Sequence, residues 1–266
     1  MKSVPKRKLK IAPEDMIQKT WIPEGSKEYA HFKLITKENK KLVETIKEHV
    51  SLKPGDLVLD VGGRDGNVAF EVQKREWIHI VDPDPTVRLL QKPGKFWNEK
   101  IQNVKFNSKV KYKLIICCHV LGYLGLQDAQ EETTKKLIDL LDVGGTLILF
   151  YNTNTGYIGE LIEYSKHVLP MGHYDYFKEG ILHNYRTHRY EVKQLDVAFP
   201  LKYKSFEELA RCCWFLFGAM DPDIEGSAKK FLPKLKKDLL EPTFMIEERM
   251  TFVTRQSHAI ALPSIE

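Results

Sequence analysis

Residues 57–66 read Leu-Val-Leu-Asp-Val-Gly-Gly-Arg-Asp-Gly, a short apolar run that ends in a cluster of glycines. Consecutive apolar residues on both faces are typical of a strand that is buried inside a parallel sheet. Glycine lets the backbone turn sharply and approach a ligand closely. A helix is predicted from Asn67 to about Lys74, and a second strand over 78–81. The segment therefore predicts strand, glycine turn, helix and strand, the repeating unit of an α/β sheet.

The same alternation extends on both sides of this segment. Apolar positions at helical spacing predict a helix over 42–50, before Pro54-Gly55. Further strands are predicted over 114–118 and 146–150, separated by a helix whose buried face runs from Ala129 to Leu141. These elements predict a doubly wound, mostly parallel α/β sheet.

The alternation stops after Tyr151. A segment dense in Tyr and His follows over 173–190, and residues 195–203 alternate between apolar and polar, as in a half-buried antiparallel strand. Residues 250–254 again have the pattern of a sheet strand. We expect four parts: a tail and cap segment over 1–41, the sheet core over 42–155, a helical and antiparallel lid over 156–242, and the strands that complete the sheet over 243–266.

Length and composition exclude several classes of protein. A chain of 266 residues suits one large domain with one active centre, and 42% hydrophobic residues exclude general disorder. No apolar run approaches the about 20 residues of a membrane helix, so we expect no membrane partner. No apolar segment follows the basic amino terminus, as a secretory signal requires, so we predict a cytoplasmic location. The net charge of +5 permits an anionic partner without requiring one.

The four cysteines form two adjacent pairs, Cys117-Cys118 and Cys212-Cys213. Neither pair has the spacing of metal ligands. We expect reduced, small core residues and no bound metal.

Two aspartates follow successive predicted strands. Asp60 lies at the end of the first strand and Asp82 directly after the second. The ribose hydroxyls of an adenosine cofactor need a carboxylate acceptor at the end of the second strand. The G-x-G-x-x-G spacing of a dinucleotide-binding turn is absent from Gly62-Gly63-Arg64-Asp65-Gly66, which argues against a nicotinamide dehydrogenase.

The run from Asp60 to Gly66 resembles the first motif of the class I S-adenosylmethionine-dependent methyltransferases, Asp-x-Gly-x-Gly-x-Gly. Arg64 stands where the family has its middle glycine. The resemblance continues at Asp82, at His119-Val120-Leu121-Gly122-Tyr123 and at Gly144-Gly145, and covers roughly residues 42–150 and the terminal strand. It implies a seven-stranded, Rossmann-like sheet, S-adenosyl-L-methionine as cofactor and methyl transfer as the reaction.

The resemblance also implies a set of site residues. Asp82 is expected on the ribose, with Pro83 against the adenine ring, and the end of the fourth strand is expected to line the reacting centre. With Tyr29 added as an aromatic face, the cofactor-binding candidates are Tyr29, Asp60, Gly62, Gly63, Gly66, Asp82, Pro83, Cys118 and His119. His119 or His183 could accept a proton, and Tyr123 and Tyr185 could offer rings to a cation, so these four are the catalytic candidates.

Simpler interpretations of these residues stay open. His119 could be an ordinary strand-end residue bonded to the backbone, and the Tyr and His residues over 173–190 could form a surface hairpin. The leading hypothesis is methylation of an N or O atom of a small molecule, held beneath the lid. The alternatives are RNA or another macromolecule as acceptor, prompted by lysines over 2–10 and 229–237, and a non-catalytic cofactor-binding partner.

Overall fold

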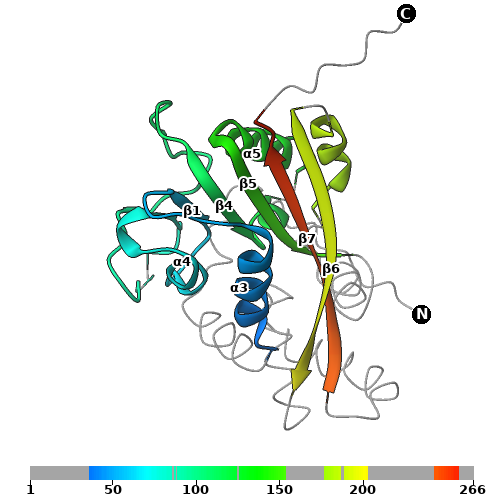
Figure 1. Cartoon of the computed structure of the whole chain (residues 1–266). Coiled ribbons are helices and arrows are strands. Elements are labelled where there is room, and N and C mark those ends of the chain that lie inside the picture. Colours follow the sequence, from blue (N-terminus) through cyan, green and yellow to red (C-terminus); the bar gives the residue numbers. More distant parts are fainter. Residues whose placement is uncertain are drawn as a thin grey trace, which may run out of the picture.

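The computed structural model contains one seven-stranded sheet with the strand order β3-β2-β1-β4-β5-β7-β6 (Figure 1). It describes residues 36–85, 87, 89–124, 126–153, 177–186, 189–202 and 243–257. The strands are β1 (Val58–Val61), β2 (Ile78–Val81), β3 (Lys95–Trp97), β4 (Tyr112–Cys118), β5 (Leu141–Asn152), β6 (Tyr190–Lys202) and β7 (Thr243–Arg255).

The pairing confirms the predicted mostly parallel sheet. β1 pairs in parallel with β2 and β4, β2 with β3, and β4 with β5. β7 is antiparallel to both β5 and β6, and it alone among the described strands runs against the others. All four residues of β1 are buried, as a central strand covered on both faces requires.

Helices cover both faces of the sheet. Leu137 of α5 (Gln127–Asp139) and Leu182 of the 3-10 helix η3 (Glu179–Tyr185) pack with Leu59 of β1 and Val253 of β7. Phe252, the neighbour of Val253, points to the opposite face, where its ring lies 5.1 Å from the ring of His49 in α3. The remaining helices are α3 (Glu38–His49), which contacts α4 (Asn67–Val72), and the 3-10 helices η1 (Arg75–Trp77) and η2 (Leu121–Leu124).

Three elements differ from the sequence prediction. β3 was not predicted, because it has three residues, all at least partly exposed, at the edge of the sheet. β5 begins at Leu141, which was expected on the helix, because the residues around Gly144 (φ 67°) bulge where the register with β4 shifts. β6 lies within the range expected to form the lid, yet it pairs with β7 along its whole length and belongs to the sheet.

Some expectations fall on residues outside those described. They are Tyr29 with the cap segment before residue 36, the second cysteine pair, and the parts of the lid over 154–176 and 203–242. The lid therefore stays a prediction. In the described part of the chain, no helix combines the length and the apolar character needed to cross a membrane.

Candidate functional site at the carboxyl ends of the parallel strands

The glycine turn after β1 is held against β2. The N–H of Gly62 (φ 70°) donates to the carbonyl of Val81 at 2.7 Å, and the N–H of Gly66 (φ 80°) donates to the carbonyl of Gly63 at 2.8 Å. A Cβ atom on Gly63 would lie 2.5 Å from the carboxylate of Asp60. The turn therefore excludes side chains at these positions, both because of its backbone angles and because of its packing.

The side chains of Asp60, in β1, and Asp82, directly after β2, both contact the glycine turn. Asp60 lies beside Ile80 in the β1–β2 register, and its carboxylate is packed under Gly63. Asp82 is fully buried, and its Oδ2 accepts the N–H of Arg64 at 2.9 Å. Its Oδ1 accepts the N–H of Asp84, also at 2.9 Å. Burial raises the pKa of Asp82, and these two backbone hydrogen bonds oppose the rise.

The backbone of Arg64 lies in a conformation that favours glycine. Its φ is 46°, in the left-handed region that disfavours a Cβ atom. Its guanidinium lies 3.9 Å from the carboxylate of Asp84, a contact that also ties the turn to the loop after β2. Arg64 therefore holds the turn in a left-handed backbone conformation, which costs free energy of folding.

Two substitutions at Arg64 separate the energetic cost of its backbone conformation from the contribution of its side chain. Arg64→Gly and Arg64→Ala both lose the contact with Asp84, but only glycine removes the left-handed penalty. We expect the glycine variant to exceed the alanine variant by about 1 kcal/mol in free energy of unfolding, measured by urea denaturation. An alanine variant as stable as the glycine variant would mean that the backbone at this position is not strained.

His119 lies directly after β4 and is fixed by β5. Its N–H donates to the carbonyl of Phe150 at 2.8 Å, and its ring packs edge to face on the Phe150 ring at 5.1 Å. Nε2 of His119 lies 3.1 Å from Oε1 of Glu38, the first residue of α3, and 3.7 Å from Oε1 of Glu248 in β7. Both glutamates are 2% exposed.

The two carboxylates determine the charge of His119. Burial lowers the pKa of His119, but Glu248 and Glu38 together raise it to about 9. Burial raises the pKa of Glu248 to about 8, with His119 opposing the rise and Glu38 adding to it. The two glutamates therefore favour the protonated form of His119, whereas a general base has to be unprotonated, and its role as proton acceptor stays a prediction.

Tyr123 and Cys118 lie at the same edge of the sheet. Tyr123 belongs to η2, and burial raises its pKa to about 12, with Arg64 lowering it and Glu38 raising it. Burial also raises the pKa of the Cys118 thiol, and the charge of Asp60 adds to the rise. Together with half-buried Pro83, these residues lie at the carboxyl ends of β1, β2 and β4.

The structure does not bring His183 and Tyr185 to this edge. Both belong to η3, and the ring of Tyr185 lies 6.2 Å from the ring of Tyr190 at the start of β6. Burial, and then Asp139 at the end of α5, raise the pKa of Tyr185. These neighbours belong to the opposite, amino-terminal edge of β5. The apolar side of η3 packs on the α5 face of the sheet, so the structure does not group these two residues with the other site candidates.

Sequence reasoning missed several residues of the site. Glu38 and Glu248 come from segments far from His119 in the chain, and no local pattern marks them. Asn98, directly after β3, donates from Nδ2 to the carbonyls of Asp82 and Asp84 at 2.9 and 2.8 Å. Asn98 could have been found from its place directly after β3, but this short strand was not predicted from the sequence.

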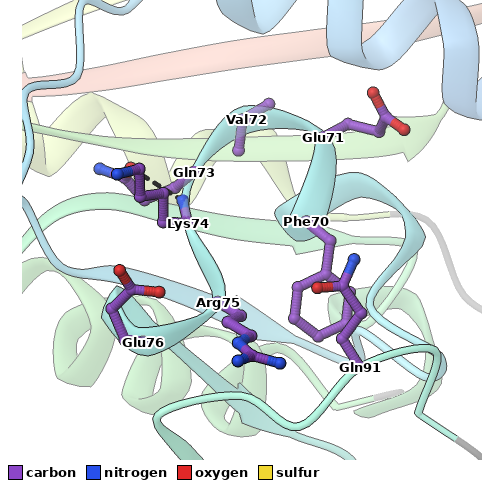
Figure 2. A pocket seen from close by; sticks show the side chains of 8 residues that line it. All are labelled: Phe70, Glu71, Val72, Gln73, Lys74, Arg75, Glu76 and Gln91. Carbon is purple, nitrogen blue, oxygen red and sulfur yellow. Dashed lines mark hydrogen bonds between the residues drawn. The ribbon is translucent and has the colours of Figure 1, made fainter.

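A surface hollow of about 510 Å³ lies elsewhere, between the end of α4 and the start of β2 (Figure 2). Figure 2 shows Phe70 and Gln91 side by side at its rim, with charged side chains around them. Ligands of open α/β sheets bind at the carboxyl ends of the strands. The hollow lies at the amino end of β2, so we do not place the site there.

The sequence matches no protein-family model and no curated protein. The fold, however, is shared with solved structures. The YcgJ protein of Bacillus subtilis has 12% identity and a TM-score of 0.55, covering 81% of this chain and 98% of its own. A candidate methyltransferase from an antibiotic biosynthesis pathway of Anabaena variabilis has 13% identity and a TM-score of 0.56, covering 80% and 96%.

The plantazolicin methyltransferase BpumL, solved in complex with SAH, has 11% identity and a TM-score of 0.53, and the match covers 92% of this chain and 98% of that one. At such identities the similarity establishes a common fold. The fold implied by the resemblance to class I methyltransferases is therefore confirmed.

Proposed function

We propose that this chain is an S-adenosylmethionine-dependent methyltransferase that acts on an N or O atom of a small molecule. One observation carries the proposal: the carboxylates of Asp60 and Asp82 contact a single glycine turn at the carboxyl ends of adjacent parallel strands. A solved protein of the same fold, BpumL, is a methyltransferase in complex with SAH, which supports the same cofactor here.

The residues around the turn fit the nucleoside part of this cofactor. A carboxylate offers about four acceptor positions, and two of those of Asp82 receive the N–H groups of Arg64 and Asp84. The others would receive the two ribose hydroxyls, which requires the atoms that bury Asp82 to move aside when the cofactor binds. Pro83 is placed beside Asp82 for contact with the adenine ring. The methionine part would lie along the backbone of the turn, where Gly62 packs against Val120 and Gly63 against Asp60.

When bound, the cofactor supplies a methyl group on a sulfonium. The chain's own residues then have to orient the acceptor and exclude water. Tyr123 stays neutral at physiological pH because of its raised pKa, so it offers a hydroxyl and a ring face rather than a charge. Nε2 of His119 faces Glu38 and Glu248, which favours acceptors that need no base, such as a neutral amine.

Calorimetry with S-adenosylmethionine tests the proposal, with NAD as the matched negative ligand. We expect binding in the micromolar range for S-adenosylmethionine and none for NAD. A screen of small amines and hydroxyl compounds for production of S-adenosylhomocysteine then tests catalysis.

No binding at millimolar S-adenosylmethionine would end the proposal. Binding without turnover of any acceptor would leave the non-catalytic alternative. Steep weakening of acceptor binding by salt would instead indicate a nucleic-acid acceptor. The cytoplasmic location stays a prediction.

A further inference from the structure

Glu38, His119 and Glu248 form a buried cluster of potential metal ligands. Each offers one ligand atom, and these three atoms lie within 4.8 Å of one another. The residues come from the start of α3, the end of β4 and the middle of β7. Glu248 lies opposite Asn152 of β5 and Val197 of β6, so the sheet fixes its backbone on both sides.

The cluster contains oxygens that have no hydrogen-bond partner. Three buried side-chain polar atoms in the described residues lack a partner, and two of them are Oε2 of Glu38 and Oε2 of Glu248. An unsatisfied buried polar atom costs about 1–3 kcal/mol, and a charged one costs more. Two such atoms in a single cluster indicate a group that binds both carboxylates.

The balance of charge points to a divalent cation. Metal ligation requires both carboxylates to be ionised, which places two negative charges in a site where each glutamate is 2% exposed, and such burial is costly unless the charges are compensated. Protonated His119 compensates one of them. A divalent ion bound to two carboxylates and a neutral imidazole makes the cluster neutral.

The distances agree with coordination around one ion. Metal–ligand distances to imidazole nitrogen and carboxylate oxygen are about 2.0–2.2 Å. Neighbouring ligand atoms of such an ion lie about 3–3.6 Å apart in octahedral or tetrahedral geometry. The Nε2–Oε1 distance of 3.1 Å to Glu38 falls within this spacing, and that of 3.7 Å to Glu248 lies just above it.

We propose that Glu38, His119 and Glu248 bind a divalent transition-metal ion of the zinc type. One nitrogen and two carboxylate donors suit such an ion, whereas Mg²⁺ and Ca²⁺ prefer oxygen ligands alone. The site joins α3 to β4 and β7 beside the glycine turn. The sequence led us to expect no bound metal, so the proposal differs from that expectation. It does not depend on S-adenosylmethionine.

Titration of metal-free protein with ZnCl₂, in the absence of S-adenosylmethionine, tests the site. We expect one equivalent of Zn²⁺ to bind and to raise the melting temperature, with no comparable effect of MgCl₂. Glu38→Gln and Glu248→Gln should each weaken Zn²⁺ binding at least about ten-fold. Glu44→Gln, which removes an exposed carboxylate from the same helix α3, should leave Zn²⁺ binding unchanged.

The melting temperature of the Glu248→Gln variant, relative to the unsubstituted protein, should change in opposite directions with and without Zn²⁺. Without Zn²⁺, Glu248→Gln replaces a buried carboxyl group that has an unpaired oxygen with a neutral amide of the same size, and it should melt at or above the temperature of the unsubstituted protein. With Zn²⁺ the order should reverse. A residue that served only to hold His119 by a hydrogen bond would instead lower the melting temperature in both conditions.

If a variant fails to fold, the visible absorption spectrum of the unsubstituted protein with Co²⁺ still tests the site. Co²⁺ bound by one imidazole and carboxylates should give a saturable visible band, displaced by Zn²⁺ and free of thiolate charge transfer. Thiolate charge transfer, or Zn²⁺ affinity that is the same in the unsubstituted protein and in Glu38→Gln and Glu248→Gln, would overturn the proposal.

Discussion

Asp82→Ala should lower the affinity for S-adenosylmethionine by at least about 100-fold. The ribose hydroxyls lose two charge-assisted hydrogen bonds, each worth about 1.5–3 kcal/mol. The N–H groups of Arg64 and Asp84 lose their acceptor as well, so the turn itself loosens. Calorimetric titration measures the change, and circular dichroism checks that the variant is folded.

Two further variants isolate the role of the carboxylate. Asp82→Asn keeps the volume and one carbonyl oxygen but loses the charge, so we expect an intermediate loss of affinity. Asp142→Ala removes an exposed aspartate at the amino end of β5, away from the turn, and should bind the cofactor as the unsubstituted protein does. A folded Asp82→Ala variant with affinity within about three-fold of the unsubstituted protein would show that Asp82 is not the ribose acceptor, because one hydrogen bond to a charged group already exceeds that factor.

Gly62→Ala should destabilise the fold by about 2–5 kcal/mol. Its φ of 70° costs a residue with a Cβ atom about 1–2 kcal/mol. A Cβ would also lie 2.4 Å from Cγ2 of Val120, and overpacking of this kind costs about 1–3 kcal/mol. The free energy of unfolding in urea measures the sum.

Gly180→Ala is the matched control for Gly62→Ala. Gly180 is exposed in η3, has no positive φ, and a Cβ there would meet nothing within 4 Å, so a change within about 0.5 kcal/mol is expected. Combining Gly62→Ala with Val120→Ala should recover the steric part and leave the backbone part. Equal stability of Gly62→Ala and Gly180→Ala would show that the turn tolerates a side chain and does not have the described backbone.

The sheet and half of the site could be predicted because their signals are local. A continuous apolar run followed by glycines marks β1 and its turn, and the strand order then brings Asp60 and Asp82 to one edge. β3 escaped prediction because a three-residue edge strand buries too little to leave an apolar pattern.

The other half of the site depends on contacts across the sheet. Glu38 lies near the start of a polar helix and Glu248 in a strand with neighbouring charged residues, so both look like solvent-facing positions in the sequence. Their burial follows from the packing of α3 and β7 around His119. Conversely, His183 and Tyr185 of η3 suggested a binding site, but the buried apolar residues just before them, Ile181 and Leu182, fix that segment elsewhere.

A crystal structure with S-adenosylhomocysteine bound tests the central claim most directly. Both ribose hydroxyls should lie within hydrogen-bond distance of the Asp82 carboxylate, with the amino-acid part of the ligand against Gly62 and Gly63. Electron density for the ligand at any other place, such as the hollow beside Phe70, or a site that remains empty at millimolar ligand, would contradict it.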